Sequence, residues 1–212
     1  MITLDQLSRM DHPYLSAADE CWYLSTYTSG AGYRAGAVNQ LIANFKCPPS
    51  IAELDSPRAR HKERAIGTVA ARLRAAVSQS WAESVTWIPV PPSRARRDMD
   101  YDDRLMRVLR LAFARYDTDV RAALYQTASF VADHARLRRI GLDFLYECLR
   151  INWDALLSRP LRDGVVLFDD VLTTGKHYKC CKRRLRQALP DIRISGLFVA
   201  RRALSGRGRR LP

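Results

Sequence analysis

The feature that most restricts the fold of this chain is the segment from Val165 to Tyr178, which reads VVLFDDVLTTGKHY. Four apolar residues are followed by two acids, two further apolar residues, a Thr-Thr-Gly turn and a helical pattern. A short apolar run bounded by turn residues predicts a buried strand. A buried strand that feeds directly into a helix is a unit of an open α/β sheet, and ligands bind such sheets beyond the carboxyl ends of the strands.

The residues after this predicted strand have the chemistry of a site for a phosphorylated sugar. Asp169 and Asp170 are expected to emerge just after Phe168, where carboxylates can accept hydrogen bonds from sugar hydroxyls. The turn from Leu172 to His177 delivers hydroxyls and backbone N–H groups to the start of a helix, and both the N–H groups and the helix dipole favour a phosphate. Gly175 allows the backbone to approach a ligand closely.

The same segment resembles the phosphoribosyl pyrophosphate binding motif of type I phosphoribosyltransferases. The resemblance implies that Asp169 and Asp170 face the ribose hydroxyls during catalysis and that the following loop holds the 5-phosphate. The residues matched to that loop are Val171, Leu172, Thr173, Thr174, Gly175, Lys176 and His177. His177 departs from the motif, because the family usually has Thr or Ser there.

A second segment, Trp87 to Arg97, is similar to the first strand and pyrophosphate loop of competence-associated phosphoribosyltransferases. Pro91 and Pro92 cannot donate N–H bonds, so the contacts to pyrophosphate are expected to begin after them. The expected contacts are Ser93, Arg94, Arg96 and Arg97. The resemblance also implies Mg²⁺ as cofactor, bound through the pyrophosphate and ribose, with Asp169 or Asp170 as an optional protein ligand.

Two further segments are assigned by their position relative to that family. The polar stretch Gln126 to Arg139 lies where the family has a flexible lid, and four of its side chains either cover the leaving group or are simply solvated: His134, Arg136, Arg138 and Arg139. The aromatic segment Tyr23 to Tyr33 either recognises the unknown acceptor or packs the N-terminal extension on the core.

Strands that alternate with helices predict an α/β fold with a mostly parallel sheet and helices on both faces. The resemblance implies the type I phosphoribosyltransferase fold with an N-terminal hood-like extension. We expect a helical extension or hood over residues 1–82, a core over 83–202 and a basic flexible tail over 203–212. Strands are expected near 84–93, 120–125, 165–168 and 192–200, and helices near 57–81, 101–114, 141–149 and 176–189.

Other interpretations of these motifs fit the residues less well. Gly175-Lys176 does not form the phosphate loop of nucleotide triphosphatases, because Asp170 replaces the earlier glycine and His177 replaces the Ser or Thr. Adjacent acids that serve only as helix caps would be costly at the end of a buried strand. The acids at positions 98, 100, 102 and 103 fit a charged loop and a helix start better than a metal cluster, because arginines surround them.

The formal charge of +13 raises the concentration of polyanions around the surface. The predicted helix 57–81 has an apolar stripe and a basic face that we expect to be solvated, made of Arg58, Arg60, Lys62, Arg64, Arg72 and Arg74. The charge and the basic tail support a second hypothesis, a non-catalytic regulator or scaffold that associates with DNA, RNA or a nucleoprotein and retains the sugar-phosphate pocket. Phosphoribosyltransferase-like proteins with basic surfaces also resemble effectors of bacterial anti-phage systems, including retrons.

The remaining sequence features concern the compartment. The five cysteines are odd in number, without Cys-x-x-Cys spacing, which favours reduced thiols over disulfides or a zinc site. No apolar run reaches the length of a signal peptide core or a membrane span, so we expect a cytoplasmic protein without a membrane partner. An oligomer is compatible with the sequence.

Overall fold

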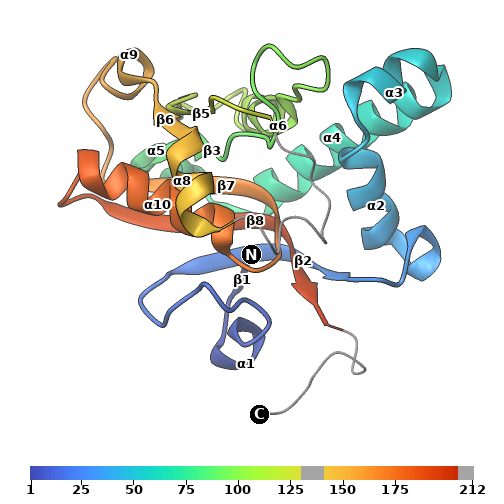
Figure 1. The fold of residues 1–212 in the computed structure, drawn as a ribbon, viewed down its shortest axis with the longest axis horizontal. Coiled ribbons are helices and arrows are strands. Elements are labelled where there is room, and N and C mark those ends of the chain that lie inside the picture. Colours follow the sequence, from blue (N-terminus) through green and yellow to red (C-terminus); the bar gives the residue numbers. More distant parts are fainter. Residues whose placement is uncertain (130–140, 205–212) are drawn as a thin grey trace.

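The computed structural model describes residues 1–129 and 141–204, which are built around a six-stranded sheet with the order β1-β2-β8-β7-β3-β4 (Figure 1). Neighbouring strands run parallel except for β1, which is antiparallel to β2. The strands are β1 (Ile2–Thr3), β2 (Cys21–Thr28), β3 (Thr86–Pro89), β4 (Asp119–Val120), β7 (Gly164–Leu172) and β8 (Arg193–Ala203). The antiparallel pair β5 (Leu124–Gln126) and β6 (Leu149–Ile151) forms a separate two-stranded sheet.

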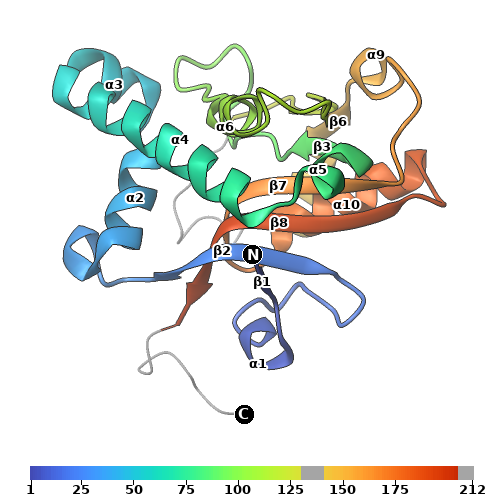
Figure 2. The same ribbon diagram turned by 180° about the vertical axis from the view of Figure 1, so that it is seen from behind.

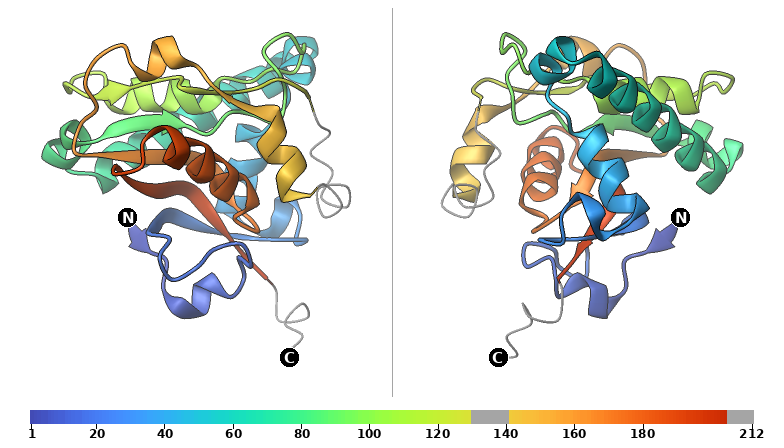
Figure 3. Two further views of the ribbon diagram at one scale, coloured as in Figure 1. Left: turned by 60° about the vertical axis from the view of Figure 1, so that its left-hand side comes forward. Right: turned by 90° about the vertical axis from the view of Figure 1, so that its right-hand side faces the viewer.

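Helices cover both faces of the large sheet, with α10 on one side and α4 on the other (Figure 3). The helices of the first half are α1 (Gln6–Arg9), a 3₁₀ turn (Tyr33–Ala35), α2 (Ala37–Phe45), α3 (Pro49–Leu54), α4 (Ser56–Ala76) and α5 (Gln79–Ser84). Those of the second half are α6 (Arg104–Ala112), α8 (Leu142–Cys148), α9 (Trp153–Leu156) and α10 (Lys176–Ala188).

The alternation of side chains along β7 divides the apolar core between the two faces. Val165 and Leu167 pack on the side of α8 and α10, whereas Val166 and Phe168 pack on the side of α4 and α6. This follows because successive side chains of a strand point to opposite faces of its sheet. Both faces of β7 are therefore buried, as the apolar run predicted.

The sheet has a topological switch point between β3 and β7. From β3 the chain passes through α6 to β4, and from β7 it passes through α10 to β8 on the opposite side of the sheet. Since β3 and β7 are themselves parallel neighbours, the connections leave their carboxyl ends in opposite directions. In open α/β sheets this is the place where ligands bind. The pairing of β3 with β7 ends at Pro89 and Phe168, whereas β7 continues beside β8 as far as Leu172.

The α/β architecture with a mostly parallel sheet is confirmed, but two boundaries differ from the prediction. Residues 1–82 were expected to be a helical extension, yet β2 lies inside the large sheet, paired with β8 from the other end of the chain. The aromatic stretch that contains Tyr23 is thus a strand of the core. The strand expected at 165–168 extends to Leu172, so Asp169 and Asp170 lie within β7 rather than after it.

Smaller elements also differ. The helix expected at 57–81 is divided into α4 and α5, because Val77 is extended and the side chain of Ser78 caps α5 through the N–H of Trp81. The strand expected at 120–125 is the end of β4 followed by β5 in a different sheet. Among the described residues, none of the helices has the length and apolar character needed to cross a membrane.

Candidate functional site

Asp170 is held by two cations at the carboxyl end of β7. Its Oδ1 lies 3.2 Å from Lys46 Nζ, at the C-terminal end of α2, and its Oδ2 accepts from Arg104 Nη2, at the start of α6. Oδ1 also accepts the backbone N–H of Val171 at 2.6 Å. The two positive charges hold the pKa of Asp170 well below its usual range despite the cost of burial.

The ion pairs continue from Asp170 toward α4. Arg104 Nη1 donates to Asp102 Oδ2 at 2.8 Å, and the same oxygen accepts from Lys62 Nζ at 2.6 Å. Lys62 also donates to the carbonyl of Cys47 at 2.5 Å. The side chains of Lys62 and Asp102 are each only 6% exposed, so Lys62 was wrongly assigned to the solvated basic face. The network joins α2, α4 and α6 to the end of β7.

Asp169 has a different environment from its neighbour. Its Oδ1 accepts the backbone N–H of Asp170 at 2.8 Å, and it has no ion pair within the described residues. Burial and the negative charge of Asp170 raise the pKa of Asp169 to about 7. The ionised form of such a carboxyl group is stabilised by any ligand that brings a hydroxyl donor or a cation to it.

The two acids have different surroundings, whereas the resemblance assigns both of them to the ribose hydroxyls. Asp170 binds Lys46 of α2 and Arg104 of α6 on one side of the sheet. On the other side, the negative charge of Asp169 adds to burial in raising the pKa of Cys181 in α10. Asp170 is engaged with Lys46 and Arg104, whereas Asp169 has no cation partner within the described residues.

The Thr-Thr-Gly turn after β7 has the geometry expected for a loop that binds a phosphate. Gly175 is the N-cap of α10 and has a left-handed backbone with φ of 82°. A Cβ atom at this position would lie 2.8 Å from the side chain of Leu15, so glycine is required for two reasons. Gly175 makes no side-chain cap hydrogen bond, and the hydroxyl of Thr174 accepts the N–H of Lys176 at 3.4 Å. An N-cap without a side-chain hydrogen bond and the helix dipole make the N-terminus of α10 suited to an anion.

The N-terminal segment packs against this turn, a contact that the sequence did not predict. His12 Nδ1 contacts the carbonyl of Thr173, and the N–H of Tyr14 donates to the carbonyl of Thr174 at 3.0 Å. Lys176 Nζ lies 5.1 Å from the centroid of the Tyr14 ring. The hydrogen bonds hold the turn through its carbonyl groups and do not consume its N–H groups.

His177, which replaces the hydroxyl residue of the motif, is neutral. Burial lowers its pKa to about 4, against a smaller opposing effect from Asp170. Its Nε2 lies 3.1 Å from Gln126 Nε2 in β5.

The predicted pyrophosphate loop follows β3 at the switch point. Arg94 pairs with Asp98 at 3.4 Å, and the guanidinium of Arg96 lies 5.9 Å from the centroid of Tyr125. Arg97 is exposed and has no ion pair within the described residues, and Ser93 is partly exposed. Tyr125 and Gln126 are adjacent in β5, so this strand connects the loop to His177.

The remaining predicted site residues lie in the core, in the charged loop before α6 or outside the described residues. The lid residues His134, Arg136, Arg138 and Arg139 lie outside the described residues. Tyr23, from the segment proposed for acceptor recognition, is 5% exposed and packs in the core. Asp98, Asp100 and Asp102 bind Arg94, Ser50 and Lys62 respectively, as a charged loop and helix start would.

The residues at the switch point fit a magnesium ion that arrives with a diphosphate. In residues 1–129 and 141–204, no group of three or more His, Cys, Asp or Glu side chains could hold a metal by itself. Mg²⁺ commonly binds through one or two carboxylates together with phosphate oxygens. Asp169 offers one carboxylate without a cation partner, which suits a metal that the substrate carries.

Comparison with known proteins gives no relative for this chain: no family model, no curated protein and no solved structure matches it.

Proposed function

We propose that this chain binds phosphoribosyl pyrophosphate with Mg²⁺ and transfers its phosphoribosyl group to an acceptor or to water. The observation that carries the proposal is the position of Asp169 and the Thr173–Gly175 turn at the topological switch point between β3 and β7. A carboxylate, a helix N-terminus with glycine as its N-cap and a basic loop all lie at the edge where an α/β sheet binds ligands.

Each part of the ligand has a counterpart among these residues. Asp169 accepts a ribose hydroxyl, and the N-terminus of α10 binds the 5-phosphate. Ser93 and Arg97, in the loop after β3, receive the diphosphate, because Arg94 and Arg96 are already engaged with Asp98 and Tyr125. Asp170 is a positioning residue that fixes Lys46 and Arg104 beside the sugar.

The reaction that follows is a substitution at C1 of the ribose. The acceptor or a water molecule forms a bond to C1, the C1–O bond to the diphosphate breaks, and the diphosphate departs with the bonding electrons. Positive charge develops on the ribose during this step, and the carboxylate of Asp169 stabilises it. Magnesium bound to the diphosphate neutralises the negative charge of the leaving group. Neutral His177 adds no charge at the 5-phosphate.

Isothermal titration of the purified chain with phosphoribosyl pyrophosphate and Mg²⁺ tests the proposal. Binding is expected for the parent and for Asp191→Asn, which alters an exposed acid in the turn after α10, and it is expected to be lost in Asp169→Asn. Circular dichroism spectra show whether the variants are folded. Equal binding by Asp169→Asn and the parent, or no binding by the parent, would refute the assignment.

A further inference from the structure

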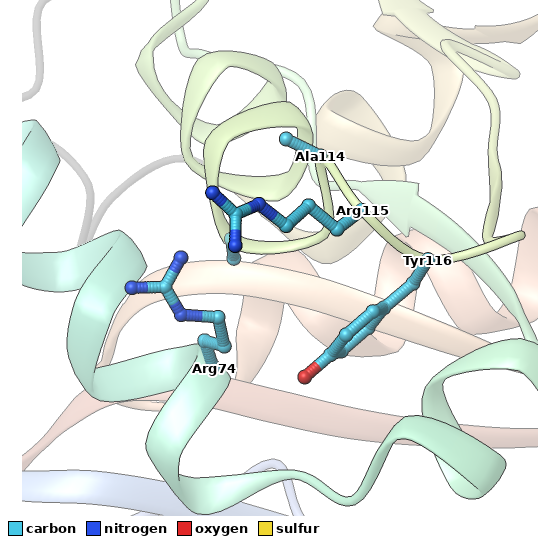
Figure 4. Close-up of a pocket in the computed structure, with 5 residues that line it drawn as sticks. Arg74, Ala114, Arg115 and Tyr116 are labelled. Carbon is cyan, nitrogen blue, oxygen red and sulfur yellow. The ribbon is translucent and has the colours of Figure 1, made fainter.

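A hollow of about 410 Å³ lies on the opposite side of the sheet from α10, between the C-terminal ends of α4 and α6. Its lining consists of Arg74, Ala112, Ala114, Arg115 and Tyr116, without an acid. Figure 4 shows the guanidinium groups of Arg74 and Arg115 turned toward one another, with the Tyr116 hydroxyl nearby. Two like charges that converge in this way repel each other, and an anion between them removes that repulsion.

The hollow is one end of a larger basic face. Arg60, Arg64 and Arg74 are exposed on α4 at a spacing that places them on one stripe of the helix. The neighbouring helix α6, which packs beside α4, contributes exposed Arg110, and exposed Arg115 lies in the turn after α6. In Figure 2 helix α4 runs across the front of the molecule. We call the surface formed by Arg60, Arg64, Arg74, Arg110 and Arg115 the α4–α6 face.

The positive charge of the α4–α6 face is not balanced within the fold. Glu63 is the only acid inside α4 and α6, and it pairs with Arg107. None of the five arginines of the face has an ion pair within the described residues. The helix dipole accounts for Arg74, in the last turn of α4, but it disfavours a cation such as Arg60 near the N-terminal end. The stability of α4 therefore does not explain the whole stripe.

The shape of the face fits an extended chain of phosphates. Gly67 and Ala71 lie between Arg64 and Arg74 on the same stripe, and no atom lies within 4 Å of a Cβ placed on Gly67. These small residues let a backbone lie close to the helix. From Arg60 to Arg74 the helix rises about 21 Å, or roughly six base-pair steps of duplex DNA. Arginine suits this role because its planar fork binds phosphate oxygens in pairs.

We propose that the α4–α6 face binds the phosphate backbone of a nucleic acid. The proposal is independent of the sugar-phosphate site, because Asp170 and α10 do not contribute to the face. It assigns to one surface the polyanion binding that the formal charge of +13 only suggests.

The test compares two triple variants of the full chain with equal charge. Arg64→Gln, Arg74→Gln, Arg115→Gln alters the face, and Arg34→Gln, Arg150→Gln, Arg186→Gln removes exposed arginines elsewhere. Each changes the formal charge from +13 to 13 − 3 = +10 and leaves the C-terminal arginines intact. Fluorescence anisotropy at several salt concentrations then measures binding of a labelled single-stranded RNA and of a labelled DNA duplex.

The first variant is expected to bind about tenfold or more weakly and to lower the slope of log K against log salt by about 2 to 3. The control is expected to weaken binding by about twofold or less, since its charges are distant and screened. Equal losses in both variants, or no salt-sensitive binding by the parent, would overturn the proposal. Binding to a polyglutamate peptide but to neither nucleic acid would overturn it as well. Unchanged binding of phosphoribosyl pyrophosphate by the first variant shows that its sugar-phosphate site is intact.

Discussion

Arg104 Nη2 donates to the carboxylate of Asp170, a contact that ties the first residue of α6 to the end of β7. The side chains of the two residues are 12% and 10% exposed, so the pair is largely removed from water. The pair spans the switch point, because α6 follows β3 and Asp170 belongs to β7. The pair therefore fixes the distance between the connection from β3 to α6 and the connection from β7 to α10. The proposed ligand binds between these two connections.

Replacement of Arg104 by methionine is expected to lower the free energy of unfolding by about 3 to 5 kcal/mol, because it leaves buried carboxylates with too few partners. Arg107→Met is the matched control. Arg107 lies on the same helix as Arg104 but pairs at the surface with Glu63 of α4, and its loss is expected to cost about 1 kcal/mol or less. Urea unfolding at neutral pH measures both. Similar losses in the two variants would show that the Asp170 pair has no special role.

Lys46→Met is expected to weaken the binding of phosphoribosyl pyrophosphate about tenfold with little change in stability. Lys46 is 41% exposed, and its charge acts on both Asp170 and His177, so it lies beside the proposed phosphate site. Arg104 and the N–H of Val171 still bind Asp170 in this variant, so the loss of the half-exposed Lys46 is expected to cost about 1 kcal/mol. Lys179→Met, which removes a similar pair with Asp19, is the control. A variant at Lys46 that binds as tightly as the parent would contradict the assignment.

Asp169→Asn is expected to change the pH dependence of stability. The pKa of Asp169 is about 7 in the folded chain and about 3.8 in the unfolded chain, so the folded state binds its proton more tightly. The contribution of Asp169 to stability is therefore present at low pH and is lost as the pH rises through 7. Asn cannot ionise, and the variant should gain stability relative to the parent between pH 5 and pH 8, as measured by urea unfolding. A constant difference between the two proteins would be evidence against this.

His177→Thr is expected to act in the opposite direction. The pKa of His177 is about 4 when folded and 6.5 when unfolded, so the unfolded state binds the proton more readily. The contribution of His177 is present above pH 6.5 and is lost as the pH falls toward 4. The variant should be less sensitive to acid over this range than the parent. It also restores a hydroxyl beside the proposed 5-phosphate, so calorimetry should detect tighter binding of phosphoribosyl pyrophosphate.

Gly175→Ala is expected to destabilise the chain by at least about 1 to 2 kcal/mol, the cost of a left-handed backbone for a residue with a Cβ atom. Contact with Leu15 at 2.8 Å adds to this cost. Gly67→Ala is the control, and its effect on the free energy of unfolding is expected to have the opposite sign. Gly67 lies in α4 with open space around it, where alanine is expected to stabilise the helix by about 0.5 to 1 kcal/mol. Equal effects at the two positions in urea unfolding would refute the argument.

The strand, turn and helix around Asp169 could be predicted from the sequence because their causes are local. The apolar run from Val165 to Phe168 requires burial on both faces, and the periodicity of α10 begins immediately after Gly175. Glycine at the turn and the order of apolar and polar residues act through neighbours in the chain, so the pattern carries the information.

The partners of the site were decided by the tertiary structure. Lys46 and Arg104 are 124 and 66 residues from Asp170, and Lys62 has the same helical spacing as its solvated neighbours. Likewise, β2 joins the sheet only through pairing with β8. Removal of charges from water and the pairing of distant strands depend on which surfaces meet in space, and no local pattern specifies that. The sequence by itself determined the unit that carries Asp169 and the turn, and the packing of distant segments decided that Asp170 is held by cations while Asp169 has no cation partner within the described residues.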